Sequence, residues 1–366
     1  MSGSVFGNRF KISTWGESHG AAVGVVVDGC PAGLPLTEED IQIYLNRRKP
    51  GQSRFATPRK EDDSVQILSG IFDGKTTGTP ISLIVYNKTA RSADYSEIAG
   101  YYRPGHADFT FDEKYGFRDY RGGGRTSGRE TIGRVAAGAI AAKVLKTMGI
   151  ELITYSRAIG GIEIDPDHMD FNEIDNNPLY MPDAQAAANA ADLLEEKLAQ
   201  KDSVGGIIEG IVTGLPAGIG EPVFDKLDAS LAKAIFSIGA VKGFEIGEGF
   251  NAARLCGSEN NDAFIIGKDG AVAKATNHAG GILGGISDGS PLVYRAAIKP
   301  TPSIARAQQT VNKDNEEITI HIKGRHDPII VPRAVVVVEA MAALTILDLL
   351  LENMGATMDG LIKFYK

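Results

Sequence analysis

Cysteine is scarce in this sequence, and its scarcity already narrows the class of protein. Only Cys30 and Cys256 occur among 366 residues, which leaves no disulfide framework and no cysteine metal site and suits a reducing cytoplasm. No uninterrupted apolar run reaches the roughly 18 residues that a membrane span needs. The first ten residues have neither the apolar core of a signal peptide nor the Arg and Ser bias of a transit peptide. These absences predict a cytoplasmic protein that makes no membrane contact.

Net positive charge is missing as well, yet the basic residues are concentrated. A formal net charge of -8 argues against nucleic acid as the main partner, because that partner requires a broad basic face. Local clustering of arginine in an acidic chain favours a pocket for a small polyanion, and a solvated basic face is the alternative for the first cluster. The two clusters are Arg47, Arg48, Lys49, Arg54, Arg59 and Lys60, then Arg103, Arg118, Arg121, Arg125, Arg129 and Arg134.

Glycine is abundant, and one glycine-rich stretch carries three arginines into a predicted helix. The 44 glycines indicate many tight turns and close backbone approaches. In Tyr120-Arg-Gly-Gly-Gly-Arg-Thr-Ser-Gly-Arg-Glu-Thr131 the arginines are four residues apart, and Ser127 with Glu130 fits a capping box. We therefore expect an amphipathic helix from about 129 to 148. A helix N-terminus flanked by guanidiniums predicts a phosphate-bearing ligand, and the alternative is a flexible surface loop.

Two histidines stand on glycine-flanked loops. Gly16-Glu-Ser-His-Gly20 matches the G-x-S-x-G elbow of serine hydrolases, but an elbow requires a helix directly after the serine. The apolar run that follows predicts a strand instead, so a hydrolase built on Ser18 is only a weak alternative. The favoured interpretation places His19 on a tight turn at a strand end, where it presents an acid or a base. His106 has a similar setting in Arg103-Pro-Gly-His-Ala-Asp108.

Three short motifs recur in the same order in the two halves of the chain. The recurrence predicts an internal duplication with halves of about 10–150 and 203–360, packed as one integrated α/β (α+β) domain over residues 1–366. An alanine-rich helix of about 184–200 lies between the halves and is expected to be peripheral. The motifs are Pro31-Ala-Gly33, Gly78-Thr-Pro80 and a helix ending Met148-Gly149, then Pro216-Ala-Gly218, Gly289-Ser-Pro291 and a helix ending Met354-Gly355.

The inventory of reactive side chains favours chemistry on a phosphate ester. The six histidines show no metal-ligand spacing, and there is neither a Cys/His nucleophile pair nor a dinucleotide fingerprint. What remains is two loop histidines, Asp327 close to Arg325, and many arginines near glycines. Arginines bind phosphates and carboxylates bidentately, and histidines exchange protons near neutral pH. The residues therefore predict a metal-independent lyase or transferase that acts on a phosphorylated carboxylate.

Five of these segments together resemble chorismate synthase, in that family's order. The resemblance implies conversion of 5-enolpyruvylshikimate 3-phosphate to chorismate, the last step of the shikimate pathway to the aromatic amino acids. The reaction would be an anti-1,4-elimination of phosphate and a C6 hydrogen that requires reduced FMN without net redox change. The resemblance also implies a β-α-β sandwich and a homotetramer. The segments are Gly16-Glu-Ser-His-Gly20, Arg103-Pro-Gly-His-Ala-Asp108, Tyr120 to Thr131, Asn277 to Ser287 and Gly324-Arg-His-Asp-Pro328.

The resemblance also implies a role for each site residue. His19 would protonate the departing phosphate, His106 would protonate the reduced flavin, and Asp327 would assist flavin N5 in accepting the C6 proton. The substrate's phosphate and carboxylates would be bound by Arg48, Arg54, Arg103, Arg129 and Arg325. The flavin would lie against Arg125, Thr126, Ser127, Gly239, Ala240, Gly284, Lys299, Pro300, Thr301, Pro302, Ser303 and Arg325.

Two departures from the family's usual pattern fall in the central loop. This chain has Arg-Thr-Ser-Gly-Arg where the family usually has Arg-Ser-Ser-Ala-Arg, so Thr126 keeps a hydroxyl and Gly128 adds flexibility before Arg129. The sequence shows no recognisable nicotinamide site, so we expect an external reductant for the flavin, and NADPH only if the protein reduces its own flavin. A non-catalytic phospho-ligand or RNA-binding module is the remaining alternative.

Overall fold

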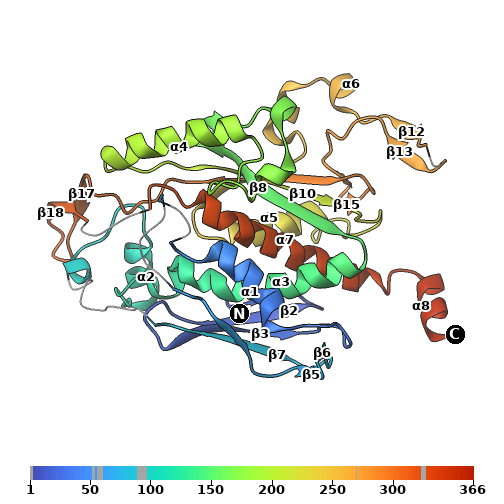
Figure 1. Cartoon of the computed structure of the whole chain (residues 1–366), viewed down its shortest axis with the longest axis horizontal. Coiled ribbons are helices and arrows are strands. Elements are labelled where there is room, and N and C mark those ends of the chain that lie inside the picture. The colour runs from blue at the N-terminus through green and yellow to red at the C-terminus, as the bar shows by residue number, and fades with distance from the viewer. Residues whose placement is uncertain (1–2, 52–53, 56–60, 89–96, 269, 323–326) are drawn as a thin grey trace.

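Two five-stranded antiparallel sheets enclose a layer of helices (Figure 1). The computed structural model describes the whole chain except residues 1–2, 52–53, 56–60, 89–96, 269 and 323–326. The first sheet has the order β1 (Val5–Phe6), β2 (Lys11–Gly16), β3 (Ala22–Asp28), β7 (Ile81–Tyr86), β4 (Val65–Ile67). The second sheet has the order β11 (Val241–Ile246), β16 (Leu292–Ile298), β10 (Gly206–Thr213), β8 (Glu151–Ile159), β9 (Ile162–Glu163).

Four helices fill the space between the sheets. The two longest pack against each other, α3 over β3 of the first sheet and α7 over β8 and β10 of the second. The shorter helices extend the same layer, one beside α3 and one beside α7. The helices are α1 (Glu38–Arg48), α3 (Thr131–Thr147), α5 (Leu227–Phe236) and α7 (Val331–Asn353). This arrangement confirms the predicted single-domain β-α-β sandwich.

The central helices are more deeply buried than the sequence suggested. The predicted helix of 129–148 begins at Thr131, and its buried residues surround it instead of forming one apolar face, because α7 covers the side that faces away from the first sheet. By length and composition α7 is apolar enough to cross a membrane, but 89% of its most apolar window is buried inside the molecule. It is therefore a core helix, which a search for an uninterrupted apolar run overlooked.

Two buried carboxylates interrupt the apolar surface of α7, and both are paired. Glu339 accepts two hydrogen bonds from the Arg47 guanidinium, at 2.7 and 3.0 Å. Asp348 accepts hydrogen bonds from the backbone N–H groups of Asn8, Arg9 and Phe10, at 2.6–3.0 Å. Such pairing is what allows a charged group to be buried in a protein interior. Asp348 thus fastens the first residues of the chain to its last long helix.

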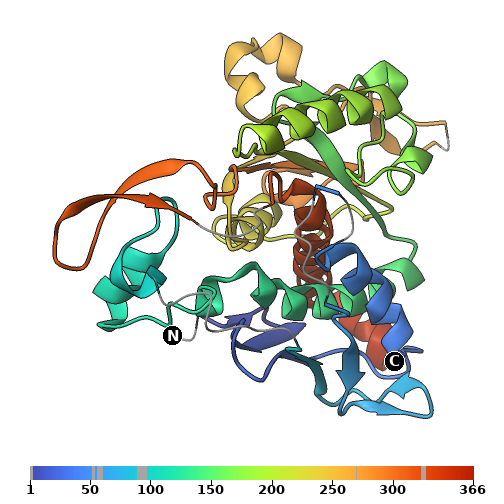
Figure 2. The same cartoon turned by 60° about the vertical axis from the view of Figure 1, so that its left-hand side comes forward.

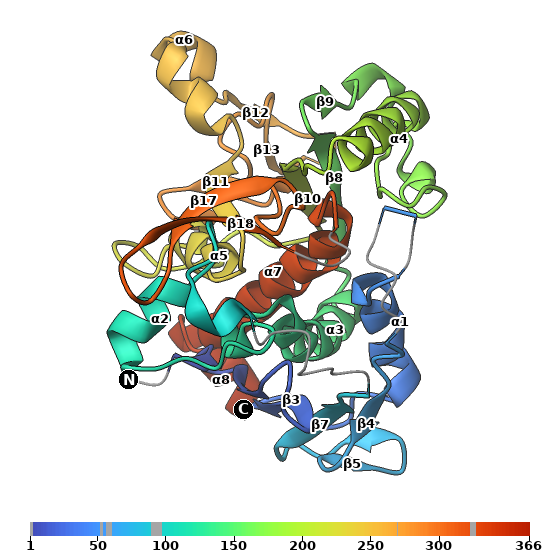
Figure 3. The ribbon, with the colours of Figure 1, turned by 90° about the vertical axis from the view of Figure 1, so that its left-hand side faces the viewer.

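Smaller elements decorate the sandwich. Helix α4 lies outside the second sheet next to β9, as its expected peripheral place requires, and Figure 2 shows the β17–β18 hairpin extending from the sandwich beside α2. The hairpin of β12 and β13 projects together with α6 (Figure 3). The bounds are β5 (Ile71–Phe72), β6 (Lys75–Thr76), α2 (Asp108–Tyr115), α4 (Ala184–Ala199), α6 (Gly257–Asn260), β12 (Phe264–Ile266), β13 (Val272–Lys274), β14 (Ile282–Leu283), β15 (Ile286–Ser287), β17 (Ala307–Val311), β18 (Glu317–His321) and α8 (Met358–Tyr365).

The two Pro-Ala-Gly turns are built by the same hydrogen bonds. In the first half the Thr76 hydroxyl donates to the carbonyl of Pro31 at 2.6 Å and accepts from the N–H of Leu34 at 2.9 Å. In the second half the Ser287 hydroxyl donates to the carbonyl of Pro216 at 2.6 Å and accepts from the N–H of Ile219 at 2.9 Å. These matched contacts support our proposal of duplicated halves over about 10–150 and 203–360.

Candidate active site

His19 lies on the turn between β2 and β3, where it packs against the glycine-rich loop. The N–H of Gly20 closes the turn by donating to the carbonyl of Glu17 at 3.1 Å. Gly122 has a φ of +62°, and a Cβ at this position would stand only 2.6 Å from Nε2 of His19. The Ser18 hydroxyl donates to the Gly122 carbonyl at 3.3 Å. A strand follows Ser18, so the geometry of a serine-hydrolase elbow is absent here.

The glycine-rich loop is anchored to the end of β2. The Arg125 guanidinium donates to the carbonyl of Gly16 at 3.1 Å and to the hydroxyl of Thr14 at 2.8 Å. The predicted capping box is not formed: Ser127 accepts instead from the N–H of Arg129 at 3.3 Å, at the start of the 3-10 turn Gly128–Glu130. The Glu130 carboxylate binds other groups, so it does not accept the backbone hydrogen bond that a capping box requires.

Arg48 and Arg129 share one buried carboxylate. Nη1 of Arg48 lies 2.7 Å from Oδ2 of Asp63, and Nη1 of Arg129 lies 3.0 Å from Oδ1 of the same residue. The side chain of Arg48 is only 4% exposed. Burial and then the nearby guanidinium of Arg333 lower the pKa of Arg48 to about 10, because both disfavour the charged form.

Arg333 connects Arg48 to Asp327. Its Nε donates to the backbone carbonyl of Arg48 at 3.2 Å, and its Nη1 lies 3.1 Å from Oδ2 of Asp327. The predicted catalytic carboxylate is therefore linked through Arg333 to the backbone of Arg48, a predicted substrate-binding arginine. We define the arginine cluster as Arg48, Arg129 and Arg333.

The remaining predicted substrate arginines lie in different surroundings. Arg103 forms a bidentate pair with Asp108, with both N···O distances 2.8 Å. Although burial acts to raise the pKa of Asp108, these hydrogen bonds hold it below its usual range. Arg54 is 65% exposed and pairs with Glu195 at 2.7 Å. Arg325 lies outside the residues that the structure describes.

His106 lies against the segment that follows β16. Its Nε2 is 2.9 Å from the hydroxyl of Ser303, and Lys299 Nζ donates to the carbonyl of Gly105 at 2.7 Å. Gly105 has a φ of +73°, and a Cβ there would stand 2.7 Å from Cβ of Pro302. The loop around His106 and the predicted flavin segment 299–303 are thus in direct contact.

Most of the predicted flavin residues converge through a few hydrogen bonds. The N–H of Lys299 donates to the carbonyl of Ala240 at 2.9 Å. Arg134, in the first turn of α3, donates to Ser237 at the end of α5 and to Glu130. These bonds bring the loop 125–127, the α5 end with Gly239, and the segment 299–303 to one end of the helix layer.

Gly284 is the exception among the predicted flavin residues. It lies exposed at the tip of the β14–β15 hairpin, which adjoins the start of β16, whereas Lys299 follows the end of that strand. A seven-residue strand spans about 20 Å. One copy of the chain therefore does not bring Gly284 together with Lys299.

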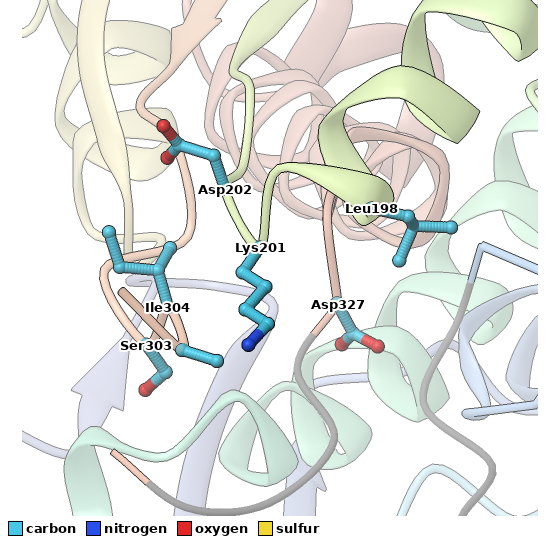
Figure 4. Close-up of a pocket in the computed structure, with 7 residues that line it drawn as sticks. Leu198, Lys201, Asp202, Ser303, Ile304 and Asp327 are labelled. Atoms are coloured by element: carbon cyan, nitrogen blue, oxygen red, sulfur yellow. The ribbon is translucent and has the colours of Figure 1, made fainter. Parts of the chain in front are cut away.

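A pocket lies between the surroundings of His106 and the arginine cluster. Ser303, the partner of His106, lines it together with Asp327, the partner of Arg333 (Figure 4). Lys201 extends into it from the end of α4, with its ammonium group between these two side chains in Figure 4. The other lining residues are Leu198, Asp202, Ile304 and Ala305.

Sequence reasoning missed Arg333 and three further residues of this site. Asp63 closes an acidic run that follows the first basic cluster, and this change of charge was the available signal for a compensating carboxylate. Asn87 stands directly after β7, where no periodicity marks its side chain. Lys201 follows α4, which no motif connects to the site.

Comparison with known proteins supplies the family. A family model described as chorismate synthase matches residues 10–351. The chain belongs to the chorismate synthase family. It is 69% identical to the chorismate synthase of Agathobacter rectalis over the full length of both chains. It is 56% identical to that of Methanosarcina mazei, covering 96% of this chain and 97% of the relative. A structure titled "Crystal Structure of Chorismate Synthase" superposes with a TM-score of 0.76 at 30% identity, covering 98% of this chain and 96% of the other.

Family membership confirms the predicted enzyme class. The chain is a carbon–oxygen lyase acting on phosphates, and its reaction is the chorismate synthase reaction, the last step of the shikimate pathway to aromatic amino acids. The serine hydrolase and the non-catalytic binding module are thereby set aside.

Proposed function

We propose that His19, His106 and Asp327, with the arginine cluster between them, perform the elimination of phosphate from 5-enolpyruvylshikimate 3-phosphate. The observation that carries this proposal is the meeting of Arg48 and Arg129 on one buried carboxylate, with Arg333 linking them to Asp327. Buried guanidiniums are costly unless anions compensate them, and a substrate with a phosphate and carboxylates supplies such anions.

The arginines bind and orient the substrate. The depressed pKa of Arg48 reflects burial and the neighbouring guanidiniums, and a bound anion offsets both effects because its negative charge favours the protonated form. Because Arg103 is held by Asp108, its contribution is to fix the loop of His106, whose N–H donates to the Arg103 carbonyl at 3.2 Å. Arg54 and Arg325 complete the proposed set of substrate-binding residues.

The proton transfers follow from the bonds that change. The electrons of the broken C6–H bond form a double bond between C6 and C1, the π electrons of the C1–C2 double bond shift to C2–C3, and the phosphate leaves C3 with the electron pair of the broken C3–O bond. In the proposal His19 gives a proton to that phosphate, which lowers the barrier to its departure. Asp327 takes part in removal of the C6 proton, and His106 keeps a proton on the flavin side of the site, next to Ser303.

The residues present suit reduced FMN as cofactor. Burial and then the nearby Lys242 lower the pKa of Lys299, and a flavin phosphate would compensate the two neighbouring positive charges. Reduced FMN, when bound, supplies an electron to the substrate transiently and regains it, which leaves no net redox change. An external reductant remains our expectation, with NADPH needed only if the protein reduces its own flavin. The cofactor would be held by Arg125, Thr126, Ser127, Gly239, Ala240, Lys299, Pro300, Thr301, Pro302, Ser303 and Arg325.

We also propose a homotetramer in the cytoplasm. The projecting hairpin exposes Phe264 and Ile266 by 66% and 73%, and contiguous apolar surface of this kind is typical of interfaces between copies. If Gly284 contacts a flavin, it does so from a second copy, because one chain keeps it far from Lys299. Both cysteines are free, which fits a reducing compartment.

An anaerobic mix of the protein with reduced FMN and 5-enolpyruvylshikimate 3-phosphate tests the proposal. We expect phosphate release while the flavin absorbance passes through a transient and returns to that of the reduced form. Phosphate release at the same rate without flavin would overturn the cofactor proposal. Full turnover by both His19→Ala and His106→Ala would overturn the residue assignment.

A further inference from the structure

The side chain of Asn87 uses all of its hydrogen-bonding groups between two parts of the proposed site. Nδ2 donates to the carbonyl of Glu17 at 2.9 Å and to the carbonyl of Gly20 at 2.8 Å. Oδ1 accepts from Nε of Arg129. The backbone N–H of Asn87 adds a fourth bond, to the carbonyl of Ala21 at 3.0 Å. A residue at the end of β7 therefore holds both the turn of His19 and an arginine at the start of α3.

These contacts determine where His19 stands relative to Arg129. Glu17 and Gly20 are the two ends of the turn, so the Asn87 amide spans the segment that presents the imidazole. On its other side Asn87 fixes the Nε edge of Arg129, and Asp63 fixes Nη1. Nη2 of Arg129 is buried and makes no hydrogen bond to any residue that the structure describes, and its ion-pair partner is Oε2 of Glu61 at 3.8 Å, so a substrate anion would compete with that carboxylate for this atom.

Only an amide satisfies all three side-chain contacts. A guanidinium donates and does not accept, so the oxygen of Asn87 must face Arg129 and the nitrogen must face the two carbonyls. An aspartate keeps an acceptor for Arg129 but turns its second oxygen against the carbonyls of Glu17 and Gly20. A leucine serves neither side. The three residue types therefore separate the two functions of this side chain.

We propose that Asn87 is a positioning residue for the elimination: it holds His19, the proton donor to the leaving phosphate, in register with Arg129, which binds the substrate anion. This inference rests on the proposed function, because it assigns Asn87 an effect through these two residues. Asn87 itself is not placed against the reacting atoms.

A double-mutant cycle with His19 tests the inference. We expect Asn87→Ala to lower kcat about 10- to 100-fold, the order of loss that a displacement near 1 Å causes, and to change kcat less than about twofold in the His19→Ala background. If Asn87→Ala lowers kcat equally in both backgrounds, Asn87 stabilises the structure without acting through His19, and the inference is overturned. Full activity of His19→Ala overturns the residue assignment of the proposed function instead.

The ratio of kcat to KM effects separates the two sides of the amide. We expect Asn87→Asp to lower kcat while KM changes little, and Asn87→Leu to lower kcat and also raise KM, because only leucine leaves Arg129 without its Nε partner. Identical KM values in the two variants would contradict the assigned contact with Arg129.

A measurement without turnover completes the test and serves also where activity is too low to measure. In labelled protein without substrate, the imidazole NMR signal of His19 should move in Asn87→Ala. The matched control is Asn177→Ala, because Nδ2 of Asn177 also donates to two carbonyls, those of Glu173 at 2.7 Å and Met181 at 2.8 Å, outside the site. An unmoved His19 signal in Asn87→Ala, with the fold verified by circular dichroism, overturns the inference.

Discussion

The two halves of the sandwich share a plan but differ in what they insert into it. When β8 is counted with the second half, which then begins at 151 and not at the predicted 203, each half has a strand pair, a Pro-Ala-Gly turn, a helix, a small hairpin, a further strand and a long helix, in that order. The first half joins β2 to β3 by one short turn that carries His19, whereas the second half places β9 and α4 between β8 and β10. The short connection leaves the histidine at a fixed strand end, and the long one brings Lys201 to the pocket.

The long helices show where the halves cooperate. Arg129 directly precedes α3, Arg333 lies in the first turn of α7, and both guanidiniums act on the pKa of Arg48. Helix N-termini carry partial positive charge, so their convergence strengthens an anion site beyond what either half provides. The two halves repeat one scaffold, and the candidate active site lies where the two halves of the same chain meet.

Removing His19, the proposed proton donor in the first half, should have the largest effect on kcat. We expect His19→Ala to lower kcat by about 10²–10⁴-fold, the usual worth of one proton-transfer group. Anaerobic phosphate release with reduced FMN measures it. The control is His168→Ala, whose side chain is 69% exposed in an insertion of the second half and should leave kcat unchanged. Comparable losses in both variants would contradict the assignment.

Adding one methyl group to the glycine-rich loop should displace the same histidine. Gly122→Ala puts a Cβ 2.6 Å from the His19 ring at a positive φ, so we expect kcat to fall about 10- to 100-fold. Gly128→Ala restores the residue usual in the family, and its Cβ meets nothing within 4 Å. This control should retain full activity. A harmless Gly122→Ala would show that the loop does not hold the ring.

Replacing Arg333, the residue that the second half contributes to the arginine cluster, should weaken substrate binding. We expect Arg333→Met to raise KM about tenfold, a loss near 1.4 kcal/mol, because Arg48 and Asp327 both lose their link. The exposed Arg9 lies near the other end of α7, at Asp348, and provides the control variant Arg9→Met. An unchanged KM in Arg333→Met would mean that the first half binds the substrate alone.

The matched turns should respond alike when their hydroxyls are removed. Thr76→Val and Ser287→Ala each leave a backbone N–H and a carbonyl without their partner, so each should lower the free energy of unfolding by about 1–3 kcal/mol. Their effects should add in the double variant, since the two sites share no partner. Urea unfolding measures all three variants. A large loss of unfolding free energy in one variant and none in the other would show that the two turns are not equivalent.

Local patterns in the sequence predicted local structure well, and long-range partners poorly. The start of α3 was placed within two residues, but its capping box was wrong because Glu130 finds Arg134 and Thr14 as competing partners. The contact of His106 with Ser303 joins residues 197 positions apart and entered only through the family resemblance.

The residues that orient the site were the hardest to predict. No spacing rule joins Asp63 to Arg129, or Asn87 to the turn of His19, because their encounter depends on how strands and helices pack. The charge balance of the sequence gave some indication of the Asp63 carboxylate and none of the Asn87 amide. Gly284 shows the opposite limit: the family motif assigned it to the flavin, and a single chain does not bring it there.

The contact of Asp348 with the backbone of Asn8, Arg9 and Phe10 has a consequence for synthesis on the ribosome. Residues 8–10 leave the ribosome early, but their partner carboxylate at position 348 emerges only after 338 further residues have been made. The first sheet therefore waits for α7 before its end is fastened and its helix layer is covered. Until then the nascent chain displays apolar surface to chaperones, and a prematurely terminated chain retains both histidine loops without an assembled site.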